Sequence, residues 1–437
     1  MVREPRRNPL SYLYGVDGMS DQLNSRIVIV GAGQAAAQAI ETLHKRGHRG
    51  PITLIGDEEL LPYQRPPLSK KFLAGALARD RLLIRHAAHY ADHAIDLRLG
   101  VAAVGIDRMR RRVEIADGSS VEYDGLLLAT GSHPRLLPLP GAELAGVHYL
   151  RSVADVDRLR AEVAPGRRVV IIGGGYIGLE VAATCREAGL DVTVLEAADR
   201  VMNRVVSPAV SSFYEAEHAK HGVHILCGAR VDSLVPGEES GDSDSPVSSP
   251  GTLTVRLEGG HGLPADFVLV AIGVAPTDAL ARAAGLDCDN GILVDEHCRT
   301  SDPHIWSAGD CARHPSIHYG TRVRLESVDN AFEQGTSAAL NMLGIPTVHD
   351  KVPWFWSDQF DLKLQMVGLS RGHDEWVARG DMTTRSFTVF YLRDGELIAA
   401  ETINQTKDQM AARKLIPARA RPDLAKLADP AVALRDA

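Results

Sequence analysis

The sequence predicts an α/β fold with two Rossmann-like dinucleotide-binding domains and a smaller C-terminal α+β domain. Three observations predict it: a strand–glycine–helix motif at residues 168–180, a second copy at residues 26–36, and a change of pattern after about Pro346. The chain has 437 residues, which is enough for two or three domains. Its hydrophobic content of 45% and charged content of 24% are those of an ordinary globular protein.

The first copy of the motif begins near the N-terminal end of the chain. In residues 26–30, Arg26 is followed by four apolar, β-branched residues, which is typical of a buried parallel strand. A glycine turn, a helix ending near Gly47 and a strand at residues 52–55 follow, and the acidic Asp57 comes about twenty residues after the turn. The turn contains Gly31, Gly33 and Ala36. Residues 1–23, before this motif, are expected to form a flexible extension.

A rigid loop follows the first motif. It runs from Leu61 to Lys70 and contains the adjacent prolines Pro66 and Pro67, which restrict the backbone to an extended approach. A lysine at the end of such a loop is useful beside a flavin, because a nearby cation tunes the ring. Spacing alone leaves a solvated surface position equally open for Lys70.

The next stretch predicts a hairpin and then a buried strand. Strand-like runs at residues 110–115 and 121–123 flank Asp117 and Gly118, a dipeptide typical of hairpin turns. The apolar run at residues 125–131 closes on a glycine and predicts a buried strand. Residues 134–140 are predicted to be a linker.

The second copy of the motif has the full G-x-G-x-x-G spacing. It follows an apolar strand at residues 169–172, and a helix is predicted over residues 179–189. The glycines allow a tight turn, close approach of a pyrophosphate, and close packing of helix on strand. They are Gly173, Gly175 and Gly178. The following strand, at residues 191–195, ends at Glu196, where a carboxylate can hold both hydroxyls of an adenosine ribose.

Two further features lie in the middle of the chain. Residues 237–250 are polar and low in complexity, and they separate strand-like runs at residues 230–235 and 252–257. This pattern predicts a flexible hairpin insertion without chemistry. Later, Asp310 lies at the mouth of a strand and at the start of a helix or turn. Its carboxylate is suited to a ribityl hydroxyl or to a helix N-cap, and the two roles are compatible.

The C-terminal region predicts an antiparallel sheet followed by a helix. Residues 385–392 alternate in polarity, turn at Asp394 and Gly395, and resume at Leu397. A helix is predicted over residues 407–415. This region therefore forms a third domain of the α+β type.

Aromatic residues gather at the start of this third domain. Residues 354–360 contain four of them, although only 5% of the chain is aromatic. Core packing is the favoured interpretation of Trp354. Trp356 is the better candidate to touch a ring system.

Composition disfavours several classes of function. The net charge of −8 disfavours nucleic acid or an anionic membrane as the main partner. No apolar run reaches the length of a membrane span, and the basic start leads into no secretory signal. The five cysteines show no C-x-x-C pair and no metal-binding spacing. They predict reduced thiols in a cytoplasmic protein without a metal site or a redox disulfide.

The motifs, taken in order, resemble the FAD-dependent, NADH-dependent ferredoxin reductases. In particular the chain looks like the putidaredoxin reductase-like partners of cytochrome P450 and ring-hydroxylating oxygenase systems. The resemblance runs from Ile27 to about Leu415. The motifs that carry it are Pro-Tyr-Gln-Arg-Pro-Pro-Leu-Ser-Lys, Leu-Ala-Thr-Gly, Gly-Gly-Gly-Tyr-Ile-Gly-Leu-Glu-Val-Ala, Ser-Ala-Gly-Asp-Cys-Ala-Arg, Glu-Ser-Val-Asp-Asn-Ala and Trp-Phe-Trp-Ser-Asp-Gln.

The resemblance implies a glutathione-reductase-like fold with an interrupted FAD domain. That domain would comprise residues 24–148 and 274–345, the NADH domain residues 149–273, and the C-terminal domain residues 346–437. The implied FAD contacts are Gly31, Gly33, Ala35, Asp57, Lys70, Ala103, Arg151, Asp310 and Val328. The implied NADH contacts are Gly173, Gly175, Tyr176, Ile177, Gly178, Glu196 and Gly273.

The resemblance also implies that three side chains are catalytic. Lys70 and Glu180 are expected to form an ion pair close to the flavin N5. Trp356 is expected to lie by the flavin, on the path toward an iron–sulfur protein. A carboxylate at position 196 repels the 2′-phosphate of NADPH, which favours NADH, and Arg200 and Arg204 nearby are assigned to the surface.

The implied function is the transfer of electrons from NADH through FAD to a [2Fe–2S] ferredoxin, which feeds a cytochrome P450 or a Rieske oxygenase. NADH gives two electrons at once and the ferredoxin takes one at a time, so a flavin is needed between them. Basic residues of the C-terminal domain are candidates for docking an acidic ferredoxin, with a solvated helix face as the alternative. They are Lys407, Arg413, Lys414 and Arg419. A monomer or a weak dimer is expected.

Other functions remain compatible with the sequence. A flavin NADH oxidase or a rubredoxin reductase would use the same fold with a different electron acceptor. An interaction protein resembling apoptosis-inducing factor would use NADH binding to reshape a signalling surface. Fast turnover with a ferredoxin would distinguish the reductase from that NADH-sensing protein.

Overall fold

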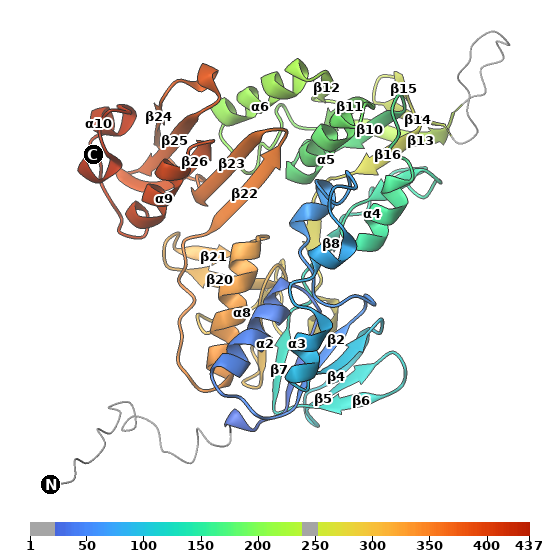
Figure 1. The fold of residues 1–437 in the computed structure, drawn as a ribbon, viewed down its shortest axis with the longest axis vertical. Coiled ribbons are helices and arrows are strands. Elements are labelled where there is room, and N and C mark those ends of the chain that lie inside the picture. The colour runs from blue at the N-terminus through green and yellow to red at the C-terminus, as the bar shows by residue number, and fades with distance from the viewer. Residues whose placement is uncertain (1–21, 238–251) are drawn as a thin grey trace. The chain divides into compact units, whose positions relative to one another are not determined.

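The computed structural model describes residues 22–237 and 252–437, which form two compact units (Figure 1). The first unit comprises the described residues up to Gln64 together with Leu83–Ser132 and Pro276–Lys351. The second comprises Arg65–Leu82, His133–Ala275 and Val352–Ala437. The expected extension at residues 1–23 and the insertion at residues 237–250 lie almost entirely outside the described residues. The boundaries expected between FAD, NADH and C-terminal domains stay a prediction.

The first unit is built on a five-stranded parallel sheet in the order β19-β7-β1-β2-β3. Its strands are β1 (Ile27–Val30), β2 (Ile52–Gly56), β3 (Asp96–Leu99), β7 (Gly125–Leu128) and β19 (Ile305–Ser307). Every residue of β1, β2, β7 and β19 is buried, as expected for strands covered on both faces. The predicted strands at residues 26–30, 52–55 and 125–131 are therefore confirmed.

Two helices of the first unit, α2 (Gln34–Lys45) and α8 (Val328–Met342), pack side by side (Figure 1). Gly335 makes this close packing possible, because a Cβ there would lie 2.5 Å from the backbone oxygen of Ala35.

The remaining elements of the first unit include the predicted hairpin, in which Val113 pairs with Val121. These elements are α3 (Ala87–Asp92), β4 (Ala103–Asp107), β5 (Arg112–Ile115), β6 (Ser120–Glu122), α7 (Ala279–Ala283), β18 (Ile292–Leu293), β20 (Ala312–Ser316) and β21 (Thr321–Val323).

The second unit contains another five-stranded parallel sheet, in the order β12-β11-β10-β16-β9. Its strands are β9 (Val147–Tyr149), β10 (Arg168–Ile172), β11 (Asp191–Glu196), β12 (Val223–Cys227) and β16 (Phe267–Val270). The helices of this half are α4 (Val153–Arg160), α5 (Tyr176–Glu187) and α6 (Pro208–Lys220). The second copy of the strand–glycine–helix motif is thus confirmed.

An antiparallel sheet of three strands adjoins this half of the second unit. It comprises β13 (Val231–Pro236), β14 (Leu253–Leu257) and β15 (Gly262–Ala265). Pro236 pairs with Leu253, so the two ends of the chain that flank the undescribed segment lie on neighbouring strands. The predicted hairpin arrangement of the two flanking runs is confirmed.

The C-terminal part of the second unit is an antiparallel sheet in the order β22-β23-β26-β25-β24. Its elements are β22 (Trp354–Gln359), β23 (Leu362–Gly368), β24 (Glu375–Arg379), β25 (Phe387–Arg393), β26 (Glu396–Ile403), α9 (Thr406–Leu415) and α10 (Leu424–Ala428). The buried guanidinium of Arg379 donates to backbone oxygens of Leu427, Asp429, Pro430 and Val432, which fixes the end of the chain to this sheet. The predicted fold class is therefore confirmed in its third part as well.

Short elements complete the structure. They are the 3₁₀ helices η2 (Pro66–Ser69), η3 (Arg79–Leu82), η4 (Met382–Thr384) and η5 (Leu434–Asp436), and the strands β8 (Ser132–Pro134) and β17 (Val274–Pro276), at which the chain passes between the units. Among all the described residues, the structure contains no helix that is long and apolar enough to cross a bilayer.

Candidate functional site

The glycine turn of the second unit connects β10 to α5. Gly173 has a φ of 111°, and a Cβ there would lie 2.4 Å from the backbone oxygen of Ala271. A Cβ on Gly178 would lie 2.1 Å from the backbone oxygen of Gly173, so both positions require glycine. A Cβ on Gly175, in contrast, would meet no protein atom within 4 Å. The backbone at Gly175 is thus open to a pyrophosphate at the start of α5, where no side chain caps the free N–H groups.

Glu196, at the end of β11, is fixed by the turn itself. Its Oε2 accepts a hydrogen bond from the Gly174 N–H at 2.8 Å, and its Oε1 accepts one from the Ala198 N–H at 2.8 Å. These two bonds hold the carboxylate beside the glycine turn. Gly174 and Ala198 were not singled out from the sequence, because a backbone N–H carries no residue-specific signal.

The two arginines near Glu196 differ in their surroundings. Arg204 is exposed, as predicted, and its Nη2 would lie 3.1 Å from a Cβ on Gly273. Arg200 is only partly exposed. Its half-buried guanidinium donates to the backbone oxygens of Val206 and Asn203 and to the hydroxyl of Ser211. Arg200 therefore fixes the segment that follows β11.

The glycine turn of the first unit has the same backbone geometry. Gly31 has a φ of 104°, and a Cβ there would lie 2.2 Å from the backbone oxygen of Ala129. A Cβ on Gly33 would meet nothing within 4 Å, and Ala35 is buried in α2. Asp57 is exposed directly after β2. These positions fit a second dinucleotide, with its pyrophosphate at the turn and its ribose near the acid.

Asp310 lies in a turn after β19 and accepts a hydrogen bond from the Ser132 hydroxyl at 2.7 Å. The chain continues from it into β20, so the alternative that Asp310 opens a helix is wrong. The preceding Gly309 donates its N–H to Oε1 of Gln334, a contact that the sequence did not indicate. The other residues implied as FAD contacts are at the start of β4 (Ala103), after β9 (Arg151) and at the first position of α8 (Val328).

The predicted ion pair between Lys70 and Glu180 is present. The Lys70 Nζ lies 2.6 Å from Oε2 of Glu180, and the two side chains are only 19% and 6% exposed. Two hydroxyl groups also donate to this carboxylate: Ser69 to Oε2 and Ser357 to Oε1, the latter at 2.7 Å. A buried carboxylate needs such partners, because burial of an unpaired charge is costly. Lys70 is therefore not the solvated surface lysine that spacing left open.

The strand β22 presents alternate side chains to its two faces. Phe355 packs on Tyr176 with ring centroids 4.7 Å apart, and Ser357 reaches Glu180, so both face α5. Trp356 belongs to the other face, where it stacks on Trp354 with centroids 5.0 Å apart. Trp354 also packs against the core of the C-terminal sheet, as predicted. The structure thus brings Lys70 and Glu180 together and places Trp356 on the opposite side of β22.

All five cysteines are free thiols. Burial raises the pKa of Cys185 to about 12, and burial also raises the pKa of Cys227 and Cys288 to about 11. These thiols stay protonated at neutral pH and are poor nucleophiles. In the described part of the chain, no group of three or more His, Cys, Asp or Glu side chains is arranged to hold a metal ion.

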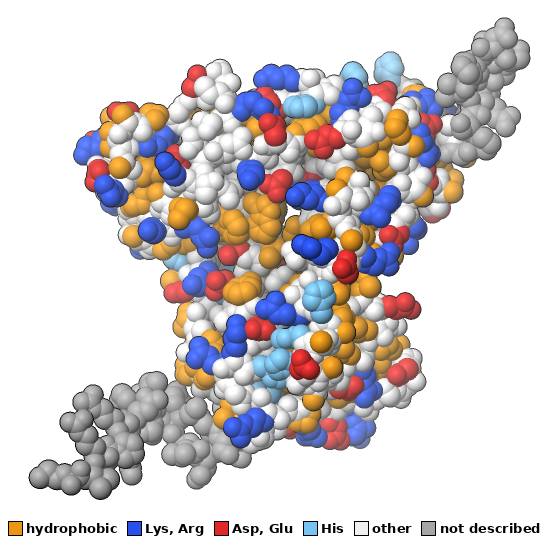
Figure 2. Space-filling view, viewed as in Figure 1, with side chains coloured by type: hydrophobic (Ala, Val, Ile, Leu, Met, Phe, Trp, Pro, Cys, Tyr) orange, Lys and Arg blue, Asp and Glu red, His pale blue; other side chains and the backbone are white. Residues whose placement is uncertain are grey.

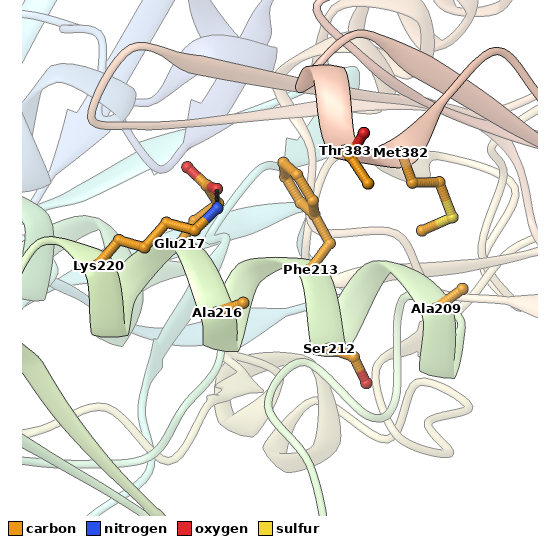
Figure 3. A pocket seen from close by; sticks show the side chains of 8 residues that line it. All are labelled: Ala209, Ser212, Phe213, Ala216, Glu217, Lys220, Met382 and Thr383. Atoms are coloured by element: carbon orange, nitrogen blue, oxygen red, sulfur yellow. Dashed lines mark hydrogen bonds and ion pairs between the residues drawn. The ribbon is translucent and has the colours of Figure 1, made fainter.

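A cavity of about 430 Å³ lies between α6 and η4 in the second unit (Figure 3). Phe213 points from α6 toward Met382 and Thr383 of η4, and the charged groups at one end, Glu217 and Lys220, pair with each other at 2.6 Å. None of the predicted site residues lines this cavity. The cavity is therefore separate from the candidate site.

The two glycine turns, each followed by a helix and an acidic residue, define a protein that binds two dinucleotides. Residues 25–335 match the family described as pyridine nucleotide-disulphide oxidoreductase, and residues 354–437 match the reductase C-terminal family. The chain belongs to the pyridine nucleotide-disulphide oxidoreductase family. It is therefore an oxidoreductase, as the sequence predicted.

Individual relatives agree with this family. The chain is 44% identical over 392 residues to rhodocoxin reductase of Rhodococcus erythropolis, with 89% of each chain covered. It is 43% identical over 397 residues to a ferredoxin–NAD(P)+ reductase of a Sphingomonas species, with 90% of this chain and 93% of the relative covered. Its structure matches that of the reductase in the covalent putidaredoxin reductase–putidaredoxin complex with a TM-score of 0.88 and 40% identity, covering 94% and 97% of the two chains. The resemblance to ferredoxin reductases is confirmed.

We expect Lys70→Met to lower the free energy of unfolding by about 2–3 kcal/mol, because it leaves the buried Glu180 carboxylate without its cation while two hydroxyl donors remain. Urea unfolding followed by tryptophan fluorescence measures the change. The exposed neighbour provides the control: Lys71→Met is expected to change stability by less than about 0.5 kcal/mol. Equal stability of the two variants would contradict a stabilising role for the pair.

Proposed function

We propose that the chain passes electrons from NADH through FAD to a [2Fe–2S] ferredoxin, which feeds a cytochrome P450 or a Rieske oxygenase. The observation that carries this proposal is the combination of two dinucleotide turns with a match to ferredoxin reductases over most of the chain. The sequence contains no C-x-x-C pair of the kind that relays electrons through a disulfide. A bound flavin would supply the conversion between hydride transfer and single-electron transfer.

The turn of the second unit binds NADH in this proposal. The backbone at Gly175 and the free N–H groups at the start of α5 receive the pyrophosphate. Glu196, oriented by the N–H groups of Gly174 and Ala198, receives the adenosine ribose hydroxyls. Tyr176, Ile177 and Gly273 complete the proposed contacts with this nucleotide.

The turn of the first unit binds FAD in this proposal. Gly31, Gly33 and Ala35 receive its pyrophosphate, Asp57 its adenosine ribose, and Asp310 its ribityl chain. Ala103, Arg151 and Val328 are proposed as further contacts. The cytoplasmic location also stays a proposal, supported by the five free thiols.

Lys70 and Glu180 are proposed to act at the flavin ring, and Trp356, on the opposite face of β22, on the path to the acceptor. Lys70 holds a positive charge at the ring, and Glu180 holds the lysine in place through the 2.6 Å ion pair. Ser69 and Ser357 hold the carboxylate in position by donating hydrogen bonds to it. Trp356 is proposed to conduct electrons toward the acceptor, with its ring orientation fixed by the stack on Trp354.

A reconstitution experiment tests the proposal as a whole. The purified protein is expected to show a flavin spectrum, to be bleached by NADH without oxygen, and to reduce a [2Fe–2S] ferredoxin rapidly. Rubredoxin and oxygen serve as alternative acceptors, and faster reduction of either would favour one of the other enzymes. Slow turnover with a long-lived charge-transfer complex would favour an NADH-sensing interaction protein. Colourless protein that cannot be reconstituted with FAD would exclude all of these functions.

NADH is expected to give a higher kcat/KM than NADPH, because Glu196 repels the 2′-phosphate. Glu196→Gln removes that charge and is expected to reduce the preference about tenfold, which corresponds to about 1.4 kcal/mol. The control is Glu187→Gln, which removes an exposed carboxylate at the far end of α5 and should leave the preference unchanged. A clear preference of the unmodified protein for NADPH would refute this role of Glu196.

The exposed face of α9 is the proposed dock for the ferredoxin. Lys407, Arg413 and Lys414 are exposed on this helix, where Met410 is also 59% exposed. Figure 2 shows Lys and Arg side chains spread over the face that carries α9 and α10. Arg419 is a weaker candidate, because Glu396 already pairs with it at 2.8 Å.

We expect Lys407→Gln with Lys414→Gln to raise the KM for ferredoxin about fivefold at low salt, because two long-range attractions are lost. Added salt should slow reduction of ferredoxin by the unmodified protein but not reduction of ferricyanide. Lys363→Gln, at an exposed position of β23, is the matched control. Equal salt responses with both acceptors would rule out electrostatic docking at α9.

A further inference from the structure

A buried carboxylate, Glu401 of β26, lies outside the site described above. Its side chain is 2% exposed and forms no ion pair within the described part of the chain. Its Oε2 accepts hydrogen bonds from the Tyr391 hydroxyl at 2.6 Å and from the Ser207 N–H at 3.2 Å, and its Oε1 accepts one from the Ser370 hydroxyl at 3.4 Å. Burial of a carboxylate without a cation lowers the stability of the fold, so Glu401 is not at this position for stability alone.

The first connection from Glu401 runs through Ser207 to the glycine turn of the second unit. Ser207 ends the segment 200–207 and caps α6. Within that segment, the Met202 N–H donates to the Gly174 oxygen at 2.9 Å, and Met202 has a φ of 49°. A left-handed conformation at a methionine persists only where its surroundings hold it. The bond to Glu401 fixes the far end of the segment and so restrains its contact with the turn.

The second connection runs through the C-terminal sheet to the other side of the same turn. Glu401 is paired in register with Met366 of β23. The sulfur of Met366 lies 2.9 Å from the hydroxyl of Tyr176, the first residue of α5. Glu401 is therefore linked to the backbone at Gly174 by one path and to the side chain of Tyr176 by another.

We infer that Glu401 is a positioning residue for NADH binding, which acts by holding Ser207 and the β23–β26 pair against the two sides of the glycine turn. The inference rests on the proposed use of NADH and adds a residue of the C-terminal sheet to the nucleotide site. Loss of its contacts loosens the turn before NADH arrives. A looser turn therefore weakens the binding of NADH, whereas the rate of the chemical step is unchanged once NADH is bound.

The surroundings of Glu401 make its contribution to the stability of the fold depend on pH. Burial raises its pKa to about 7, although the donors Tyr391, Ser207 and Ser370 act in the opposite direction. Three other charged or titratable groups surround it. The charge of Glu401 helps to raise the pKa of Tyr176, and Arg200 and His373 face Tyr391. Because the folded pKa is above the unfolded one, protonated Glu401 stabilises the fold at low pH, and that stability is lost as the pH rises through about 7.

Glu401→Leu tests the inference in the FAD-loaded protein, with ferricyanide as acceptor, because it removes the oxygen that accepts from the Ser207 N–H, whereas Gln would retain an acceptor there. We expect the KM for NADH to rise about fivefold with kcat unchanged, as for a lost hydrogen bond that acts on binding alone. The loss of stability between acidic pH and pH 7 should be smaller than in the unmodified protein. Glu401→Asp keeps the charge but withdraws it from the Ser207 N–H by one methylene, so it should raise the KM for NADH as well.

Thr402→Val is the matched control. Thr402 is the next residue of β26 and is also buried, but its side chain lies on the other face of the sheet. Its hydroxyl donates to the backbone oxygen of Gln365. This variant is expected to lower stability without changing the KM for NADH. An unchanged KM for NADH in folded Glu401→Leu or Glu401→Asp would overturn the inference, and so would an equal rise in Thr402→Val.

The FAD content and the reduction of ferricyanide keep this test separate from the proposed function. If both are normal and only the predicted KM change is missing, then Glu401 has no positioning role and the reductase function stands. If neither Glu401 variant folds, hydrogen exchange of the unmodified protein decides the question. The Ser207 amide should then exchange more slowly when NAD+ is bound, and an unchanged exchange rate would overturn the inference.

Discussion

The structure depends on one steric constraint that occurs twice: the first glycine of each dinucleotide turn passes almost in contact with the neighbouring parallel strand. A Cβ on Gly31 would lie 2.2 Å from the Ala129 oxygen, and a Cβ on Gly173 would lie 2.4 Å from the Ala271 oxygen. Both glycines have φ values near 105–110°, where other residues are strained. This approach lets the chain turn directly from the strand into the helix, so the free N–H groups of α2 and α5 face the carboxyl edge of their sheets.

A second constraint concerns the carboxylate of Glu180, which is held within the second unit by side chains from two other segments. Lys70 and Ser69 come from the loop after the double proline, and Ser357 comes from β22. Because side chains alternate along β22, the same strand that supplies Ser357 to this carboxylate directs Trp356 to its other face. The C-terminal sheet is therefore part of the electrostatic environment of α5, and Glu401 extends that relationship to the nucleotide turn.

The features that could be predicted from the sequence are those that depend on a local pattern of residues. Apolar runs indicated the buried strands, and glycine spacing indicated both turns, because these signals lie within a few residues of one another. The ion pair of Lys70 with Glu180 came from family resemblance, and their separation in the chain explains why spacing could not supply it. Ser69 and Ser357 were missed for a related reason: they reach Glu180 across 111 and 177 residues. The hydrogen bonds of Arg200 were not predicted, because its partners are mainly backbone oxygens, which leave no trace in the sequence.

The pairing of Pro236 with Leu253 has a consequence for engineering this chain. The two positions are neighbours across adjacent strands, so residues between them can be added or removed with little effect on the rest of the sheet. The entropy cost of closing a loop grows only with the logarithm of its length, which makes such changes inexpensive in folding free energy. The stretch of sequence between these two positions is therefore a suitable place to attach a fluorophore or an affinity handle while both nucleotide turns keep their native sequence.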